Sequence, residues 1–575
     1  MTAPAQTTVA DYLIARLREV GVEHVFAVPG DYAGPFLNAL DAAPGITRVA
    51  NVNELGSGYA ADGYARFKGV GCACVQWGVG TFSLLNCAAG SYVERVPVVV
   101  ISASPSTKDR ILEQTQSILF HHSTGDLRAD QIVFQNVTVA SVVIEDPAKA
   151  PGQIDDAFVA MLTHRRPIYI EVLTNVWSLP CATPQGTLTA AVRASDPASL
   201  KAALDAAWTR IVAARQPVFW VGVEIARFGL QETMQRMLDV SRLLFTTTSL
   251  AKTVLDEAQP QFIGTYAGPA SPPSTNDFVT GADCIIALGT IITDDYLNIM
   301  ASSFGAMIVA TEEELRIGYQ YYHQVTMRDF VTGLLARFEH AKAAAPVSLP
   351  PRPAQPPAAK ASDALTYNVF MWELAAFLRH EKLLDSTAFV LGESTALYVF
   401  GNLFDLPRDS FVANAAWGSL GHETGAALGI MLGGGKRAFV VAGDGGFRMV
   451  CQELSSLAMQ KCNAVIFVMS NNVYAIEQAF VDIKAFTPAG EFAAFDVLPA
   501  WDYLALATAF GAVGRCARTV AELRTVLAEI RNVTDRPTLV EIVIPQKDLA
   551  PQLKRLAEPP PPLRRSHRAE GSFRK

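Results

Sequence analysis

Short apolar segments rich in β-branched residues alternate with longer amphipathic segments along the whole chain. The apolar segments fall at residues 25–28, 74–77, 97–103, 167–173, 217–223, 244–250, 284–290, 388–394, 438–444, 464–471 and 538–544. Such alternation predicts βαβ units, in which helices cover a parallel sheet. The pattern therefore predicts an α/β protein with doubly wound parallel sheets.

Two breaks in this pattern divide the chain. The stronger is a proline-rich stretch, predicted as an extended linker at 343–364, where neither helix nor strand can propagate. A weaker break lies near 176–198. A chain of 575 residues is too long for one hydrophobic core. We therefore expect an unstructured tail at 551–575 and three α/β domains, at 1–180, 195–342 and 365–550.

Composition narrows the classes of function. The chain is 50% hydrophobic and 18% charged, with a net charge of -8 and no long basic block. It therefore lacks the electrostatic signature of a nucleic-acid or anionic-membrane partner, and it has neither a secretory signal nor an apolar run long enough for a membrane span. Eight scattered cysteines indicate reduced thiols in a cytoplasmic protein. Small-molecule chemistry is the expected activity.

A glycine-rich turn near the C-terminal end has the composition of a phosphate and cation site. An apolar strand ends in Gly443-Asp444-Gly445-Gly446, and the following strand ends at Asn471, 27 positions after Asp444. By itself Gly-Asp-Gly is equally typical of a tight turn. Two adjacent strand ends, however, can bring a carboxylate and an amide oxygen to one Mg²⁺ ion. We interpret the pair as a cation clamp for a diphosphate.

Four polar residues of the first domain each have an ordinary structural explanation. Glu54 begins a helix of small residues, where a carboxylate is usually a cap. Asp31 follows Pro-Gly, which is typical turn chemistry. His121 and His122 are adjacent, a poor spacing for chelating one metal, which leaves a polar loop or a proton relay.

Taken together, these segments resemble the thiamine diphosphate-dependent enzymes. The Gly-Asp-Gly turn with its following Asn, the segment NELGSGYAADGYAR and the segment WGSLG carry the resemblance. The branch of this family that decarboxylates 2-oxo acids also has Gly-Asp-Tyr, two adjacent histidines and Tyr-x-Ile-Glu, which stand here at 30–32, 121–122 and 474–477. The similarity covers about residues 8–550. It implies a thiamine diphosphate-binding fold in the first and third domains and a Rossmann-like middle domain.

The resemblance implies thiamine diphosphate and Mg²⁺ as cofactors. Asp444, the Asn471 side chain and the Val473 carbonyl would bind Mg²⁺, although many relatives have glycine at the position of Val473. Glu54 would hold a proton on the aminopyrimidine ring. The other residues implied in cofactor binding are Ser394, Gly418, Leu420, Gly443, Gly445, Gly446 and Ile476.

The implied reaction is decarboxylation of a 2-oxo acid to an aldehyde through an enamine on the cofactor. Its catalytic residues would be Asp31, Glu54, His121, His122 and Glu477. We expect Asp31 and His122 to be the proton donors and His121 an anchor, although spacing alone does not assign the two histidines. The implied substrate pocket favours an aromatic or branched 2-oxo acid over pyruvate, and its residues are Tyr296, Ser394, Tyr398, Ile476 and Phe480.

The family also implies an assembly and leaves alternatives open. Its active sites lie between subunits, so we expect a homodimer or a homotetramer, with the middle domain serving assembly or regulation. A carboligase similar to acetohydroxyacid synthase is one alternative, and pyruvate decarboxylase proper is another. A catalytically inactive assembly protein is the third, because fold alone never guarantees activity.

Overall fold

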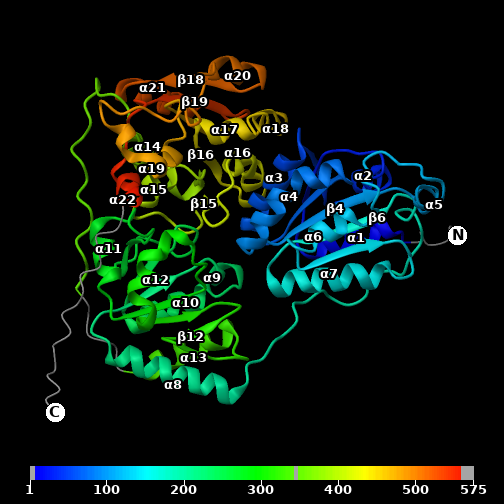
Figure 1. The fold of residues 1–575 in the computed structure, drawn as a ribbon, viewed down its shortest axis with the longest axis horizontal. Helices are drawn as coiled ribbons and strands as arrows, with labels where there is room; N and C mark the ends of the chain where they lie inside the picture. Colours follow the sequence, from blue (N-terminus) through cyan, green and yellow to red (C-terminus); the bar gives the residue numbers. More distant parts are fainter. Residues whose placement is uncertain (1–6, 342–347, 559–575) are drawn as a thin grey trace, which may run out of the picture.

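The computed structural model describes residues 7–341 and 348–558. Three sheets, each covered by helices, follow one another along the chain and form three domains around a common centre (Figure 1). The inner strands of each sheet are apolar and buried along most of their length, as a parallel sheet covered on both faces requires. All of the apolar segments named above contain strands, and the predicted α/β class is confirmed.

The first sheet is six-stranded and parallel, with the order β2-β1-β3-β4-β6-β5. Its strands are β1 (His24–Ala27), β2 (Thr47–Ala50), β3 (Gly71–Gln76), β4 (Val98–Ser104), β5 (Ala140–Ile144) and β6 (Ile168–Leu173). Its helices are α1 (Val9–Glu19), α2 (Gly34–Ala42), α3 (Glu54–Lys68), α4 (Val79–Val93), α5 (Thr107–Gln116), α6 (Ala129–Phe134) and α7 (Ala150–His164). The strand order reverses between β1 and β3.

The central sheet has the order β13-β12-β11-β10-β7-β8-β9. Its parallel strands are β7 (Pro217–Val221), β8 (Leu244–Thr247), β9 (Phe262–Thr265), β10 (Cys284–Leu288) and β11 (Met307–Ala310). Two antiparallel strands, β12 (Leu315–Ile317) and β13 (Gln320–Tyr321), extend one edge, which the sequence pattern did not predict. The helices are α8 (Pro197–Ala213), α9 (Glu224–Arg227), α10 (Gln231–Ser241), α11 (Pro273–Thr280), α12 (Leu297–Ser303) and α13 (Met327–His340).

The third sheet is again parallel and six-stranded, with the order β15-β14-β16-β17-β19-β18. Its strands are β14 (Thr387–Leu391), β15 (Phe411–Ala413), β16 (Arg437–Gly443), β17 (Val465–Ser470), β18 (Val513–Ala517) and β19 (Thr538–Val543). Its helices are α14 (Tyr367–His380), α15 (Thr395–Gly401), α16 (His422–Gly434), α17 (Asp444–Met449), α18 (Glu453–Met459), α19 (Ala475–Asp482), α20 (Tyr503–Ala509), α21 (Val520–Ile530) and α22 (Pro551–Ala557). The order reverses between β14 and β16.

Helices α3 and α16 join the first and third domains (Figure 1). Glycines let their backbones touch, because a Cβ at Gly429 would lie 1.7 Å from the Ala60 carbonyl oxygen and one at Gly63 would lie 2.4 Å from that of Ala426. One buried hydrophobic cluster includes residues of both domains. The two domains therefore share a core along this helix pair.

The ends of the third domain differ in part from the expectation. The tail expected at 551–575 is wrong for 551–557, since α22 buries Leu553 against the third domain. Residues 559–575 lie outside the described residues. The predicted linker contains no helix or strand from 348 to 360 and is almost entirely exposed. Among the described helices, none has the length and hydropathy needed to cross a membrane.

Candidate active site

Asp31 and Gln76 meet at the carboxyl edge of the first sheet, at the point where its strand order reverses. Asp31 follows β1 and Gln76 ends β3. The Gln76 Nε2 donates a hydrogen bond to Asp31 Oδ1 at 2.7 Å. A Cβ at Gly30 would lie 2.0 Å from Gln76 Oε1, so only glycine fits there. Sequence reasoning missed Gln76, because its neighbour is set by strand order rather than by sequence spacing.

The two histidines lie in the loop after α5, where His122 takes a left-handed backbone with φ 69°. The His121 Nε2 lies 3.0 Å from Asp31 Oδ2, and its ring stacks on Tyr32 at 4.6 Å between centroids. The His122 ring meets that of His121 edge-on. The structure thus places His121, the expected anchor, next to Asp31, and the separate roles of the two histidines stay a prediction. The adjacency of the two histidines in sequence gave no signal for this assignment.

Glu54 is the first residue of α3, but it is not the cap of that helix. Asn53 is the cap, because its Oδ1 accepts a hydrogen bond of 2.8 Å from the Gly56 backbone. The Glu54 side chain passes Gly80, whose Cβ would lie 3.4 Å from its Cγ. Within the described part of the chain, no hydrogen bond engages the Glu54 carboxylate. This half-buried carboxylate is therefore available to a ligand.

A second set of residues surrounds a cavity of about 160 Å³ in the third domain. The cavity opens at the carboxyl edge of the sheet, where β14 and β16 mark the reversal of strand order, the usual place for a ligand in a doubly wound fold. The predicted residues that line it are Ser394, Gly418, Leu420, Gly443, Gly445, Gly446, Ile476 and Glu477. The lining also includes Tyr474 and Ala475 of the predicted Tyr-x-Ile-Glu motif, and three residues that sequence reasoning missed, Tyr367, Glu393 and Thr395.

The backbone around the cavity explains its glycines. A Cβ at Gly445 would lie 2.1 Å from the Tyr474 ring, so the ring can pack only against glycine there. Gly418 has a φ of 69°, a conformation that other residues rarely adopt. Gly443 immediately precedes α17, and Gly445 and Gly446 stand in its first turn. Because these three residues have no side chain, their backbone can contact a ligand at this edge.

Asp444, Asn471 and Val473 lie side by side behind the cavity. Burial raises the pKa of Asp444 to about 6, although the Asn472 backbone N–H donates a hydrogen bond of 2.6 Å to its Oδ2. The Asn471 Nδ2 is buried and has no partner among the described residues. The left-handed backbone belongs to Asn472, with φ 57°, so Val473 needs no glycine. A divalent cation would restore the Asp444 charge, and these residues fit Mg²⁺.

Three residues predicted for the substrate pocket lie outside this cavity. Tyr296 packs in the central core against Trp220, 4.9 Å between centroids, and does not line the cavity. The Tyr398 hydroxyl lies 3.3 Å from Glu393 Oε1 and 3.4 Å from Asp295 Oδ1. Phe480 is 55% exposed on α19. Asp295, which precedes Tyr296 in the chain, is therefore the residue of the central domain that contacts Tyr398.

Glu393 is the most strongly perturbed acid at the cavity. Burial, assisted by the negative charge of Asp295, raises the pKa of Glu393 to about 8. Burial likewise raises the pKa of Asp295 to about 6. The Tyr398 hydroxyl lies between them, so these two acids share one small polar cluster. Such clustering of perturbed acids at a cavity is typical of functional sites.

Within one chain the two sets of residues are apart. The cavity lining includes none of Asp31, Glu54, His121 and His122. In Figure 1, α2 and α5 lie on the opposite side of α3 and α16 from α15 and α19. The predicted network of the histidines with Asp31 and Glu477 is therefore not formed inside a single chain.

Models of the thiamine pyrophosphate enzyme domains match three parts of the chain. The N-terminal TPP binding domain matches residues 7–124, the central domain 204–328 and the C-terminal TPP binding domain 396–542. An alpha-keto-acid decarboxylase of Mycolicibacterium paratuberculosis is 31% identical over 98% of both chains. The chain belongs to the thiamine diphosphate-dependent 2-oxo acid decarboxylase family. This confirms the resemblance drawn from the motifs.

Other relatives in this decarboxylase family are similar over nearly their whole length. An alpha-keto-acid decarboxylase of Mycobacterium leprae is 30% identical over 97% of both chains. Pyruvate decarboxylase isozyme 1 of Saccharomyces cerevisiae is 29% identical over 95% of this chain and 97% of its own. The two cofactor-binding domains of the family are the ones that carry the two separate sets of residues here.

Proposed function

We propose that this chain converts a 2-oxo acid to an aldehyde and carbon dioxide, with thiamine diphosphate and Mg²⁺ as cofactors. Family membership and the names of the relatives support decarboxylation. The observation that carries the aldehyde outcome is the hydrogen-bonded pair of Asp31 and His121. Release of an aldehyde requires a proton at the former keto carbon, and an imidazole is the side chain best suited to exchange protons near neutral pH.

The chain's own residues would divide the work between holding the cofactor and moving protons. When bound, thiamine diphosphate supplies a nucleophilic carbon and an electron sink. Asp444, Asn471 and the Val473 carbonyl hold Mg²⁺ at the diphosphate, and Glu54 holds a proton at the aminopyrimidine ring. His121, oriented by Asp31, gives a proton to the product carbon. Glu477 is exposed and lines the cavity, where it would face the carboxylate of a bound substrate.

We infer that a complete active site forms between two copies of the chain. The support is geometric, since the cavity is lined only by third-domain residues, and the proton-carrying residues lie on the first domain, away from it. A two-fold dimer would bring the first domain of one copy to the third domain of the other, and would do so twice. A dimer or a tetramer of two dimers satisfies this requirement.

The preferred substrate in this proposal has an aromatic or branched side chain, with pyruvate as the alternative. The Tyr398 ring is turned toward Asp295 and Glu393 and does not line the cavity, which leaves more space for the substrate. A panel of 2-oxo acids of increasing side-chain size, assayed for carbon dioxide and aldehyde, tests the proposal. We expect kcat/KM to rise from pyruvate to phenylpyruvate. The opposite order would contradict the substrate assignment, and acyloin in place of aldehyde would indicate a carboligase.

We also place the reaction in the cytoplasm. All eight cysteines are free, and Cys72, Cys74 and Cys284 are buried in strands. Free thiols persist in a reducing compartment. Fractionation of the native cells, followed by the 2-oxo acid decarboxylase assay, tests this placement.

A further inference from the structure

The turn that links β3 to α4, residues 76–80, lies against predicted catalytic residues of the first domain. Its first residue, Gln76, donates the hydrogen bond of 2.7 Å to Asp31. In its middle, Gly78 touches the histidine loop, because a Cβ there would lie 2.3 Å from the His122 carbonyl oxygen. A shift of this turn would therefore move both Asp31 and the loop that carries the two histidines.

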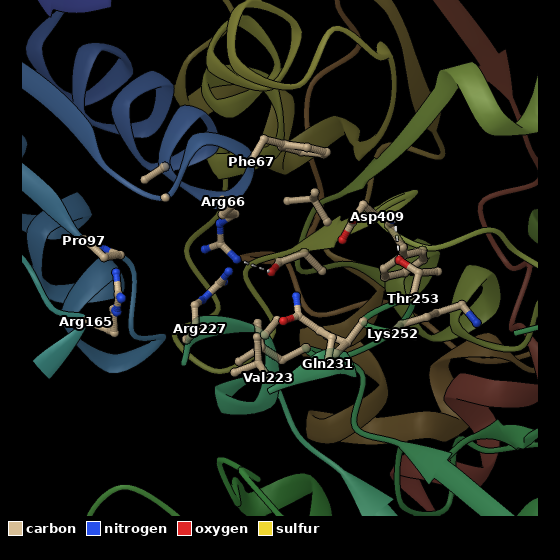
Figure 2. Close-up of a pocket in the computed structure, with 18 residues that line it drawn as sticks. Arg66, Phe67, Pro97, Arg165, Val223, Arg227, Gln231, Lys252, Thr253 and Asp409 are labelled. Atoms are coloured by element: carbon tan, nitrogen blue, oxygen red, sulfur yellow. Dashed lines mark hydrogen bonds between the residues drawn. The ribbon is translucent and has the colours of Figure 1, made fainter. Parts of the chain in front are cut away.

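The same turn supports Glu54. A Cβ at Gly80 would lie 3.4 Å from the Glu54 Cγ, an ordinary packing distance. Helix α3 leads from Glu54 to Arg66 and Phe67, which line a separate cavity of about 260 Å³ between the three domains (Figure 2). Of the described residues that line this cavity, none belongs to the turn. The turn therefore acts on the predicted catalytic residues of the first domain and not on that cavity.

The contact with the histidine loop requires glycine at residue 78, and glycine leaves the start of α4 without a cap. Gly78 immediately precedes α4 and has a φ of 71°, which residues with a side chain rarely adopt. The backbone N–H groups at a helix start have no partner within the helix, and a capping side chain usually accepts a hydrogen bond from one of them. Because glycine has no side chain, an acceptor for this end of α4 has to come from elsewhere in the fold.

Asp130 of α6 supplies this acceptor. Its Oδ2 accepts a hydrogen bond of 2.9 Å from the Gly78 backbone N–H and a second one from the Thr81 hydroxyl. Asp130 is 1% exposed, and its Oδ1 has no hydrogen-bond partner among the described residues. Burial raises the pKa of Asp130, and the two hydrogen bonds lower it. A carboxylate is costly in so buried a place, and the positive end of α4 offsets part of that cost.

We propose that Asp130 is a positioning residue, which fixes the Gly78 turn and through it three catalytic residues. These residues are Asp31, Glu54 and His122. The inference rests on the proposed decarboxylation, because that reaction assigns the three residues their roles. The alternative is that Asp130 only stabilises the fold by capping α4. The two explanations differ for the folded protein, since only a positioning residue changes the reaction rate and the histidine loop.

Asp130→Ala in the full chain, assayed with its cofactors, tests the proposal. The substitution removes the acceptor shared by the Gly78 backbone N–H and the Thr81 hydroxyl, so the turn is held less firmly. We expect kcat for phenylpyruvate to fall by roughly tenfold to 100-fold, because small displacements of catalytic groups are that costly. Asp130→Asn keeps an oxygen that can accept both hydrogen bonds and should recover most of the lost rate. A rate in Asp130→Asn as low as in Asp130→Ala would contradict the acceptor role.

The matched control is Asp155→Ala, in α7 of the same domain. The Asp155 Oδ2 also accepts two hydrogen bonds, from the Tyr12 hydroxyl at 2.9 Å and from the Arg16 Nη2 at 2.7 Å. We expect Asp155→Ala to lower the midpoint of urea unfolding and to leave kcat of the folded protein unchanged. If Asp130 only caps α4, Asp130→Ala will likewise lose stability and keep its kcat, and the proposal is overturned.

A second pair of variants keeps the proposal testable if Asp130→Ala does not fold. Thr81→Val keeps the shape of the side chain and removes the hydroxyl, so Asp130 loses one of its two partners. We expect kcat to fall by roughly twofold to tenfold, the value of one hydrogen bond. Thr81→Ser restores the hydroxyl and should return kcat close to that of the unaltered chain. Equal kcat in the two folded variants would overturn the proposal.

A measurement without turnover separates this inference from the proposed function. The chain has nine histidines, so isotope-labelled histidine gives few NMR signals, and those of His121 and His122 are assigned by substituting each with Gln. In the cofactor-free chain we expect Asp130→Ala to shift these two signals and Asp155→Ala to leave them in place. Unmoved signals in Asp130→Ala would overturn the positioning role. If the signals shift but the unaltered chain decarboxylates no 2-oxo acid, the proposed function fails and the placement of the histidine loop by Asp130 stands.

Discussion

The first and third domains present their functional residues at the same topological position but in opposite surroundings. Both sets follow strands where the order of a six-stranded parallel sheet reverses. In the first domain the key groups are open to solvent, with the Asp31 side chain 63% exposed and that of His121 52% exposed. In the third domain Asp444 is 1% exposed and Glu393 has a pKa raised to about 8 by burial.

This difference shows that sheet topology decides where a ligand binds, and burial decides what the residues there can do. Exposed groups with hydrogen-bonded partners exchange protons readily, which suits the proposed role of His121. Buried acids and tightly packed glycines bind and shape a cofactor, which suits the cavity of the third domain. The central sheet reverses between β10 and β7, where the backbones of Gly222 and Gly289 touch, since a Cβ at Gly222 would lie 2.0 Å from the Gly289 carbonyl oxygen.

The largest effect is expected from Glu54→Gln, which tests whether a carboxylate of the first domain takes part in the reaction. The amide keeps the volume and cannot hold the same proton, so we expect kcat to fall by about 100-fold or more. Folding should be unchanged by circular dichroism, because Asn53 and not Glu54 caps α3. The matched control, Asn53→Ala, should lose about 1 kcal/mol of stability with little change in kcat. Full activity in Glu54→Gln would contradict the assigned role.

Asp444→Asn tests whether the third domain holds the cofactor. We expect the affinity for thiamine diphosphate with Mg²⁺, measured by calorimetry, to fall by about 100-fold, since a charged ligand of the metal is lost. Asp31→Asn, in the first domain, is the matched comparison and should bind the cofactor nearly as well as the unaltered chain. Equal losses of cofactor affinity in the two variants would show that the two domains do not differ in how they bind the cofactor.

Gln76→Leu tests whether Gln76 positions Asp31 for its contact with His121. Without the Gln76 amide, Asp31 loses one of its two tethers and no longer orients His121 as well. We expect kcat/KM to fall by roughly tenfold or less, the value of one hydrogen bond to a charged group. Gln76→Glu should be worse than Gln76→Leu, because it places a second negative charge beside Asp31. If both variants kept full activity, Gln76 would have no positioning role.

The last effect concerns stability and not catalysis, and it is a pH dependence that comes from the third domain. Folding raises the pKa of Glu393 to about 8, so the stability that its neutral form contributes is present at low pH and is lost as the pH rises toward 8. Denaturant titration of the cofactor-free chain should show Glu393→Gln gaining roughly 1–3 kcal/mol over the unaltered chain between pH 5 and 8. Parallel curves for the two proteins would show that Glu393 is not buried as a neutral acid.

Much of this organisation could be predicted from sequence, because it depends on local patterns. Apolar runs identified the strands, and the glycines and Asn471 identified one edge of the third sheet. What the sequence could not supply was strand order, which brings Gln76 to Asp31, and the packing of the central domain on the third, which brings Asp295 to Tyr398. The sequence also could not show which histidine lies next to Asp31, because adjacent residues in a loop with a left-handed His122 follow no regular spacing. The position of Tyr296 in the central core depends on a short helical turn, Asp294–Tyr296, which sequence patterns rarely define.

The central claim, that two chains build each active site, is tested most directly by mixing two inactive variants. Chains carrying Glu54→Gln and Glu477→Gln are produced together with different affinity tags, and the mixed dimers are purified and assayed for decarboxylation. Because a two-fold dimer has two equivalent sites, the mixed dimer should hold one intact site and show about half the activity of the unaltered dimer. Mixed dimers as inactive as both parents would show that each site is built within a single chain, and would contradict the account.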